Sequence, residues 1–228
     1  EELISNFTET MRDTVGAEFY ASGGDDHLDG LGAICLASVY PSPNSEQQVP
    51  GIDRTDPAHT YWRAMSGAQF TDHRGIVRGP FNTAEAWSLT GGADGGWQKG
   101  YLAVSNGNEH PDLIITHPDH WAQYDASLLP QERFTNSKLA DAGFENLAYK
   151  GATVVADDDC VDDKGVKCTY ILTTKYIYVR PDTMCENKLI VDGRHPMETV
   201  RADRILMEWV GNMTCTRPNR QCCIQNKT

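Results

Sequence analysis

Three residues near the middle of the chain, His117, Asp119 and His120, have the types and spacing that most suggest chemistry. Two imidazoles three positions apart, with a carboxylate between them, could hold a divalent metal ion and activate water for hydrolysis. The HExxH pattern of zinc proteases differs, because it places its histidines four positions apart around a glutamate. The segment also suits a helix start, with Thr116 as the hydroxyl cap and Pro118 in the first turn. We therefore predict a helix start and keep a metal-dependent hydrolase using His117 and His120 as the alternative.

A run of aspartates between residues 157 and 163 could gather a cation: Asp157, Asp158, Asp159, Asp162 and Asp163. Their spacing lacks the D-x-[DN]-x-[DN]-G order of a calcium loop and the glutamate that closes it. Runs of like charge are usually solvated. We predict an acidic, hairpin-like connection between two strands, with cation binding as the alternative.

The cysteines follow no metal-binding or disulfide pattern. There are seven, at irregular spacing: Cys35, Cys160, Cys168, Cys185, Cys215, Cys222 and Cys223. No CxxC is present, and this usage predicts reduced thiols. The sequence also lacks a GxSxG elbow and a GxxxxGK[ST] phosphate loop. We predict that the chain is not an enzyme, and we assign it no catalytic, cofactor-binding or metal-binding residue.

The composition is that of an acidic globular chain. Among 228 residues, 39% are hydrophobic, 23% are charged and the formal net charge is -12. A protein that binds nucleic acid needs a basic surface, so this charge argues against such a role. It is compatible with the wall of a container, because that wall should not adhere to the polyanion inside it. No apolar run approaches the roughly 20 residues of a membrane span, and residues 1–10 do not have the features of a signal peptide. Three glycosylation sequons, at Asn6, Asn212 and Asn226, are the only support for a secreted binding domain.

The chain opens with a helical pattern. Apolar residues recur at helical spacing: Leu3, Ile4, Phe7, Met11, Val15 and Phe19. The stop signal is Ser22-Gly23-Gly24. Because no cap precedes this pattern, we expect the helix to continue from an upstream segment.

The middle of the chain predicts alternating helices and strands. Asn82 and Glu85 resemble a capping box and predict a helix start. The glycine-rich stretch 91–100 predicts a flexible loop and no helix, because each internal glycine costs about 1 kcal/mol relative to alanine. Residues 112–116 form a short apolar run that predicts a buried strand, and a helix follows with Trp121, Tyr124 and Leu128 on its buried face.

The last third of the chain has the alternation of strands. We predict strands at 152–156 and 169–179, rich in valine, isoleucine, threonine and tyrosine. Residues from Ile205 to Cys215 alternate onto one face of a long strand that buries Trp209, and residues 221–224 predict a strand returning beside it. The predicted fold class is α+β.

From residue 51 onward, six segments follow one another with the order and spacing of one known family. They are 51–63 (from Gly51-Ile52-Asp53-Arg54 to Tyr61-Trp62-Arg63), 110–116 (His110-Pro111-Asp112-Leu113-Ile114-Ile115-Thr116), 124–134, 143–152, 159–177 and 209–215 (Trp209-Val210-Gly211-Asn212-Met213-Thr214-Cys215). In these segments the chain resembles the tailed-phage major capsid proteins with the Hong Kong 97-type fold. The N-terminal arm and extended loop of that family have no counterpart in the sequence.

The resemblance implies an α+β fold with a peripheral domain, containing a spine helix and long strands, and a mixed α/β axial domain. Residues 1–24 would end the spine helix, 25–193 would form the axial domain and 194–228 would return to the peripheral domain. It further implies a structural subunit that self-assembles into pentamers and hexamers and encloses double-stranded DNA.

The implied partners are identical subunits, scaffolding proteins and decoration proteins, and the implied location is the virion after assembly in the host cytoplasm. The resemblance implies no membrane and no sequence-specific DNA binding. An encapsulin-like nanocompartment subunit shares this fold and stays as an alternative.

Overall fold

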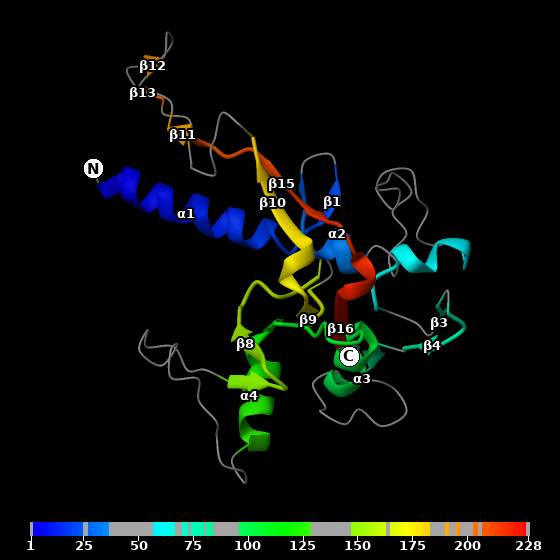
Figure 1. Cartoon of the computed structure of the whole chain (residues 1–228). Coiled ribbons are helices and arrows are strands. Elements are labelled where there is room, and N and C mark those ends of the chain that lie inside the picture. The colour runs from blue at the N-terminus through cyan, green and yellow to red at the C-terminus, as the bar shows by residue number, and fades with distance from the viewer. Residues whose placement is uncertain are drawn as a thin grey trace.

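A six-stranded mixed sheet lies at the centre of the chain (Figure 1). The structure, a computed structural model, describes residues 2–24, 27–36, 57–66, 70–72, 74–79, 81–83, 96–128, 147–162, 165–182, 190–191, 195–196, 203–204 and 207–226. The strands follow the order β5 (Asn82–Thr83), β16 (Cys222–Asn226), β9 (Cys168–Leu172), β6 (Leu113–Thr116), β8 (Ala152–Ala156) and β7 (Leu147–Tyr149). β5 runs parallel to β16 and β6 parallel to β8, and the other neighbours are antiparallel.

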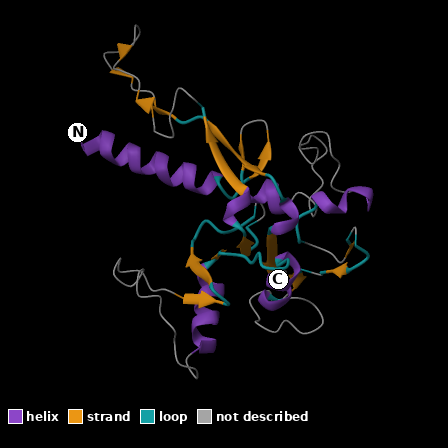
Figure 2. Ribbon diagram, viewed as in Figure 1, coloured by secondary structure: helices purple, strands orange, loops and turns teal. Residues whose placement is uncertain are grey.

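Helices and smaller strand pairs surround this sheet (Figure 2). The described α-helices are α1 (Glu2–Glu18), α2 (Leu31–Leu36), α3 (Trp97–Val104) and α4 (Pro118–Leu128), and the 3-10 turns are η1 (Pro57–Trp62), η3 (Thr174–Tyr176) and η4 (Pro218–Arg220). The antiparallel pairs are β1 (Ser22–Gly24) with β2 (His27–Asp29), β3 (Phe70–Thr71) with β4 (Val77–Arg78), β10 (Ile177–Pro181) with β15 (Gly211–Cys215), β11 (Ile190–Val191) with β14 (Met207–Glu208), and β12 (His195–Pro196) with β13 (Asp203–Arg204). The fold class is α+β, as predicted. None of the described helices combines the length and the apolar character needed to cross a bilayer.

Strand β9 is buried along its whole length and separates two apolar clusters. Successive residues of a strand point to opposite faces of the sheet. Ile171 accordingly joins one cluster, while Tyr170 and Leu172 join the other. The neighbouring strand β6 follows the same rule, with Ile114 beside Ile171 and Ile115 packed against the opposite cluster. The sheet is therefore covered on both faces.

The adjacent cysteines of β16 are explained by the same alternation. Cys222 lies in the cluster with Ile171, and Cys223 lies in the cluster with Tyr170. Both thiols are fully buried, where a cysteine behaves as a small apolar side chain. Their adjacency therefore follows from filling both faces of one strand.

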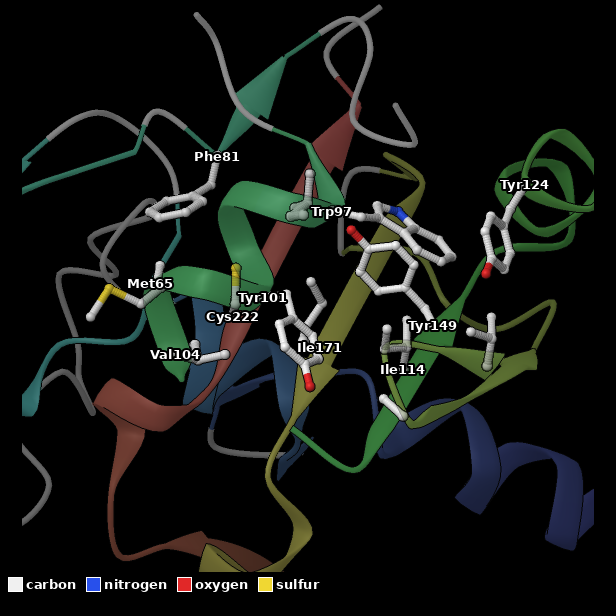
Figure 3. Packing of buried hydrophobic residues seen from close by; sticks show 14 of the residues in the cluster. Met65, Phe81, Trp97, Tyr101, Val104, Ile114, Tyr124, Tyr149, Ile171 and Cys222 are labelled. Carbon is white, nitrogen blue, oxygen red and sulfur yellow. The ribbon is translucent and has the colours of Figure 1, made fainter. Parts of the chain in front are cut away.

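Aromatic side chains dominate the face covered by α3 and α4 (Figure 3). Trp97 packs against Tyr124 at 4.9 Å between ring centroids and against the edge of Tyr149 at 5.7 Å. The hydroxyl of Tyr124 donates to the Ala148 carbonyl at 2.9 Å. These contacts fix both helices to the strand pair β7–β8.

Gly100 lets α3 approach the sheet closely. A Cβ atom at this position would lie 3.0 Å from the Cδ1 atoms of both Ile171 and Ile224 and 3.1 Å from Sγ of Cys222. Such contacts are tighter than nine in ten real Cβ contacts, so a larger residue would force these side chains to shift by a few tenths of an ångström. Gly100, which weakens the helical pattern in the sequence, therefore allows α3 to pack closely against the sheet.

The other face is covered by the end of α1, by α2 and by β15. Tyr20, Ile34 and Met213 pack with Tyr170 in this second cluster. The backbone of α2 is tied to the end of α1, since Leu31 N–H donates to the Phe19 carbonyl at 2.7 Å. Figure 1 shows the remainder of α1 projecting away from the sheet.

Several predicted elements are confirmed. The first helix, the strand at 113–116, the helix at 118–128 and the strand at 152–156 are present as α1, β6, α4 and β8. The buried face of α4 holds Tyr124, while Trp121 is only partly buried and the side chain of Leu128 is outside the described residues.

Other predictions are wrong. Asn82 begins a short strand that pairs with β16 because its backbone completes the sheet edge, so it does not start a helix. The predicted loop at 91–100 contains the first turn of α3, whose packing outweighs the propensity cost of Gly100; residues 84–95 are otherwise outside the described residues. The predicted strand 169–179 is broken by η3 at Thr174–Tyr176. Residues 222–226 pair with β9 and β5, so they are not a partner of 205–215.

Replacing Gly100 with valine should destabilise the fold. Valine is a better helix former than glycine, so any loss must come from crowding against Ile171 and Ile224. We expect the free energy of unfolding in urea to fall by about 1–3 kcal/mol. Gln98→Val, at an exposed position of the same helix, is the matched control and should change little. Equal stability of the two variants would contradict the close approach.

The two tryptophans should differ in their cost of truncation. Trp97 is fully buried, so Trp97→Ala should cost about 3–5 kcal/mol. Trp209 was expected to be buried but is only partly so, packing edge-on against Phe19 at 6.1 Å. Trp209→Ala should therefore cost less, about 1–2 kcal/mol. Thermal and urea unfolding of both variants would test the ranking, which similar losses would disprove.

Candidate functional site

Of the predicted histidine site, His120 is buried, His117 is partly exposed and Asp119 is exposed. His120 has only 1% of its surface exposed, and its Nδ1 lies 3.1 Å from Oγ1 of Thr169. The Thr169 hydroxyl is in turn 2.7 Å from that of Thr116. Nε2 of His120 has no hydrogen-bond partner among the described residues. No substrate can reach this imidazole without opening the sheet.

The helix start is organised differently from the prediction. Thr116 is a buried residue of β6, and its hydroxyl meets Thr169, so it is not the helix cap. Instead the His117 ring nitrogen Nδ1 accepts a hydrogen bond from the Asp119 N–H at 3.2 Å. The Asp119 carboxylate forms an ion pair with Lys167. His117 is thus the residue that caps α4.

The two imidazoles are not arranged around a common centre. Their ring centroids are 6.4 Å apart with the planes at 67°. Across the part of the chain that the structure describes, no group of three His, Cys, Asp or Glu side chains is gathered for a metal ion. The geometry offers the hydrolase alternative no support.

Two aspartates of the connection between β8 and β9, Asp157 and Asp162, link this loop to other elements by hydrogen bonds. Asp157 accepts a hydrogen bond from the Tyr20 hydroxyl at 2.5 Å, which links the loop to the end of α1. Asp162 is buried and accepts from Nε2 of Gln225 at 2.9 Å, which links the loop to β16. The expected solvated turn is therefore correct only for Asp158 and Asp159, and Asp163 lies outside the described residues.

The thiols are poor nucleophiles. Burial raises the pKa values of Cys160, Cys222 and Cys223. A thiol must be deprotonated to attack, so these groups are unreactive while the fold is closed. None of the six described cysteines forms a disulfide, and Cys185 lies outside the described residues.

A long antiparallel hairpin, which we define by the described residues 168–182 and 207–226, extends from the central sheet. β9 continues through η3 into β10, and β15 continues through η4 into β16, so the sheet pair β9–β16 and the pair β10–β15 are consecutive parts of one ladder. The described fragments β11–β14 and β12–β13 continue the pairing outward. Figure 1 shows this hairpin projecting beyond the central sheet.

The corner of the hairpin changes its register by one residue. Ile171 pairs with Cys222 inside the sheet, and Ile177 pairs with Cys215 outside it. Five residues (172–176) therefore connect one side and six (216–221) connect the other. An unequal count bends a strand pair in the way that a bulge does. The turns η3 and η4 occupy this corner.

The base of the projecting pair is anchored on α1 and β2. Met213 is buried in the second cluster, and Trp209 contacts Phe19. Asn212 and Asp29 exchange two hydrogen bonds, at 2.8 and 3.0 Å. The end of the chain therefore lies against the end of its first helix.

Apolar side chains remain exposed on this projecting pair. Tyr178, Val179 and Val210 are 47%, 41% and 53% exposed. Exposed apolar residues that gather on one element are typical of surfaces that contact other proteins. The sequence did not reveal this surface, because alternation predicts a strand but not which of its faces is left uncovered.

Comparison with known proteins identifies the fold. No family model matches the sequence, and no curated protein matches it. A chain in the capsid asymmetric unit of cyanophage A-1(L) has a similar structure, with a TM-score of 0.56 and 13% identity, over 99% of this chain and 68% of that one. The holo-SrpI encapsulin of Synechococcus elongatus matches with a TM-score of 0.45 and 12% identity, over 57% of this chain and 47% of its own, which is about half the encapsulin chain. The protein has a phage-capsid fold, as the resemblance in its sequence implied.

The buried histidine should make stability depend on pH. Burial, followed by the charges of His117 and Lys167, lowers the pKa of His120 to about 4, against roughly 6.5 in an unfolded chain. Between about pH 4 and pH 6.5, the folded state therefore binds fewer protons than the unfolded state. The stabilising contribution is complete above about pH 6.5 and is lost as the pH falls toward 4, by up to about 3 kcal/mol.

Urea unfolding at pH 7 and pH 4.5 would measure this loss. Because carboxylates titrate in the same range, the parent is compared with His120→Gln. The fall in the free energy of unfolding between pH 7 and pH 4.5 should be smaller in this variant, by most of the ~3 kcal/mol assigned to His120. His110→Gln, at an exposed position away from His120, is the control and should keep the dependence of the parent. An unchanged dependence in His120→Gln would exclude this histidine as the source.

Proposed function

We propose that the chain is a structural subunit of an icosahedral phage capsid and is not an enzyme. The observation that carries the proposal is the likeness to the cyanophage capsid chain over 99% of the residues. Copies would form pentamers and hexamers, close into a shell and enclose double-stranded DNA without reading its sequence. Scaffolding and decoration proteins would be further partners. The shell would assemble in the host cytoplasm and become part of the virion.

The charge of the chain supports a container. With a formal net charge of -12, the subunit would repel the phosphates of packed DNA and leave it free to move. The burial of His120 and of the five thiols Cys35, Cys160, Cys168, Cys222 and Cys223 supports a role without catalysis, because these groups are shielded from a substrate in the folded state.

The projecting part of the hairpin supports contact between copies. Subunit interfaces are broad, and a few central apolar residues contribute most of the binding energy. Tyr178 and Val210 have the exposure and apolar character for this role. We propose that the peripheral domain includes residues 1–24 and the outer hairpin within 194–228, and that the axial domain lies within 25–193. Within residues 194–228, strand β16 lies in the central sheet and not in the outer hairpin.

Expression of the full-length gene product that contains these residues should yield closed icosahedral particles. Electron microscopy of the purified material would detect them, and their diameter and symmetry would be uniform. Soluble monomers at high protein concentration, with and without a co-expressed scaffolding protein, would contradict the proposal.

Tyr178→Asp should prevent assembly without unfolding the subunit. A buried charge at an interface costs about 2 kcal/mol or more per contact, and every copy in a shell carries the change. Sedimentation would measure the particle fraction, and circular dichroism would show that the fold is kept. Leu102→Asp, at a 56% exposed position on α3, is the control. Equal particle yields from the two variants would remove the hairpin from the interface.

A further inference from the structure

Two adjoining hollows lie beside η4, at the corner of the hairpin, and neither is lined by His117, His120 or residues of β10 and β15. The first has a volume of about 270 Å³, and its polar lining includes Thr60, Asp72, Arg74, Asn106 and Arg220. The second, of about 290 Å³, is lined by residues that include Tyr61 and Arg217. Asn219 and Arg220 line both, so the two spaces share a wall. Their sides come from η1, the β3–β4 hairpin, the turn after α3, and η4.

Arg220 is a buried cation that forms no direct ion pair with a carboxylate in the described part of the chain. Its side chain is 9% exposed, and one guanidinium nitrogen donates to the Val104 carbonyl at 3.1 Å. Its Nε–H has no hydrogen-bond partner among the described residues. A buried guanidinium without an anion carries a desolvation cost that a bound anion would offset.

Two further arginines are close enough to act on Arg220. Burial is the largest effect and lowers the pKa of Arg220; the charge of Glu109 raises this pKa, and the charges of Arg74 and Arg217 lower it. Arg217 lies over the ring of Tyr176 and has no carboxylate within ion-pairing distance in the described part of the chain. The hollows therefore hold an excess of positive charge in a protein that is strongly acidic.

The nearby carboxylates are already paired. Asp72 lies 3.0 Å from Nε of Arg78 and 3.5 Å from Arg74. Glu109 lies 2.6 Å from Nζ of Lys175. Glu109 also attracts Arg217 and Arg220 from a distance, but the two carboxylates are outnumbered by the cations around them, which are Arg74, Arg78, Lys175, Arg217 and Arg220.

The hydrogen-bond donors surround the first hollow from separate walls. The Thr60 hydroxyl is buried and has no partner in the described part of the chain. Arg74 comes from the β3–β4 hairpin and Arg220 from η4. Donors on three sides suit an oxyanion with three or more oxygens better than a planar carboxylate, and guanidinium groups bind phosphate with paired hydrogen bonds.

We propose that the hollow at Arg220 is a binding site for a phosphate-type dianion, either inorganic phosphate or the phosphate group of a small phosphomonoester. The site is independent of the capsid proposal, because Thr60, Arg74 and Arg220 lie outside the projecting pair β10–β15 on which the assembly argument rests. A bound dianion would tie the β3–β4 hairpin to η4 and so to β16.

Calorimetric titration of the full chain with inorganic phosphate tests the site, with sodium chloride keeping the ionic strength constant. Phosphate should bind saturably, one per chain, and acetate at least about tenfold more weakly. Titration with adenosine monophosphate distinguishes the source: tighter binding than phosphate indicates a nucleotide with its base near Tyr61, and equal or weaker binding indicates free phosphate. Absence of saturable phosphate binding, or equal affinity for acetate, would overturn the proposal.

Three variants localise the binding. Arg220→Lys keeps the charge but loses the guanidinium geometry, and it should weaken phosphate binding at least about tenfold. Arg74→Gln and Thr60→Val remove donors from the other walls and test the site if Arg220→Lys fails to fold. Arg180→Gln, at an exposed position on β10, removes the same charge elsewhere and should leave the affinity unchanged. A loss in Arg180→Gln equal to that in Arg74→Gln would indicate general attraction and would refute a built site.

Discussion

The whole arrangement depends on the pairing of β9 with β6 on one side and β16 on the other. All five residues of β9 are buried, and they alternate between two apolar clusters. A slip of one residue in either ladder would exchange the faces and place Tyr170 where Ile171 belongs. The layers on both sides take their positions from this register. The aromatic contacts of α3 and α4 fix one side, and the end of α1 with α2 fixes the other.

Local pattern was enough to predict the elements whose stability is local. Strand β6 is a short apolar run, and α4 begins at a proline and keeps Tyr124 on its inner face, so both were predictable from the sequence. Helix α3 was not, because Gly100 lowers helix propensity and its value lies only in the contact with Ile171 and Ile224. The break at η3 was also hidden, since its residues suit a strand and the corner is set by unequal chain lengths on two distant segments.

The candidate sites divide in the same way. His117 and His120 are near in sequence and were easy to find, yet the fold buries one and uses the other as a cap. Around the two hollows, Arg74 comes from the β3–β4 hairpin, whereas Arg217, just before η4, and Arg220, within η4, come from much later in the chain, and no motif links the two segments. No pattern in one sequence could bring them together. The capsid resemblance succeeded because it depended on the order of many segments, which reflects the fold as a whole.

The course of the hairpin has a mechanical consequence. A pull on its outer end travels along β10 and β15 and enters the sheet through β9 and β16, which have neighbours on both sides. Tension along these strands has to shear several inter-strand hydrogen bonds at once, whereas an edge strand can be peeled away one bond at a time. A wall built from such units would resist stretching best along the strand direction, so pressure from within would be carried by its most strongly paired segments.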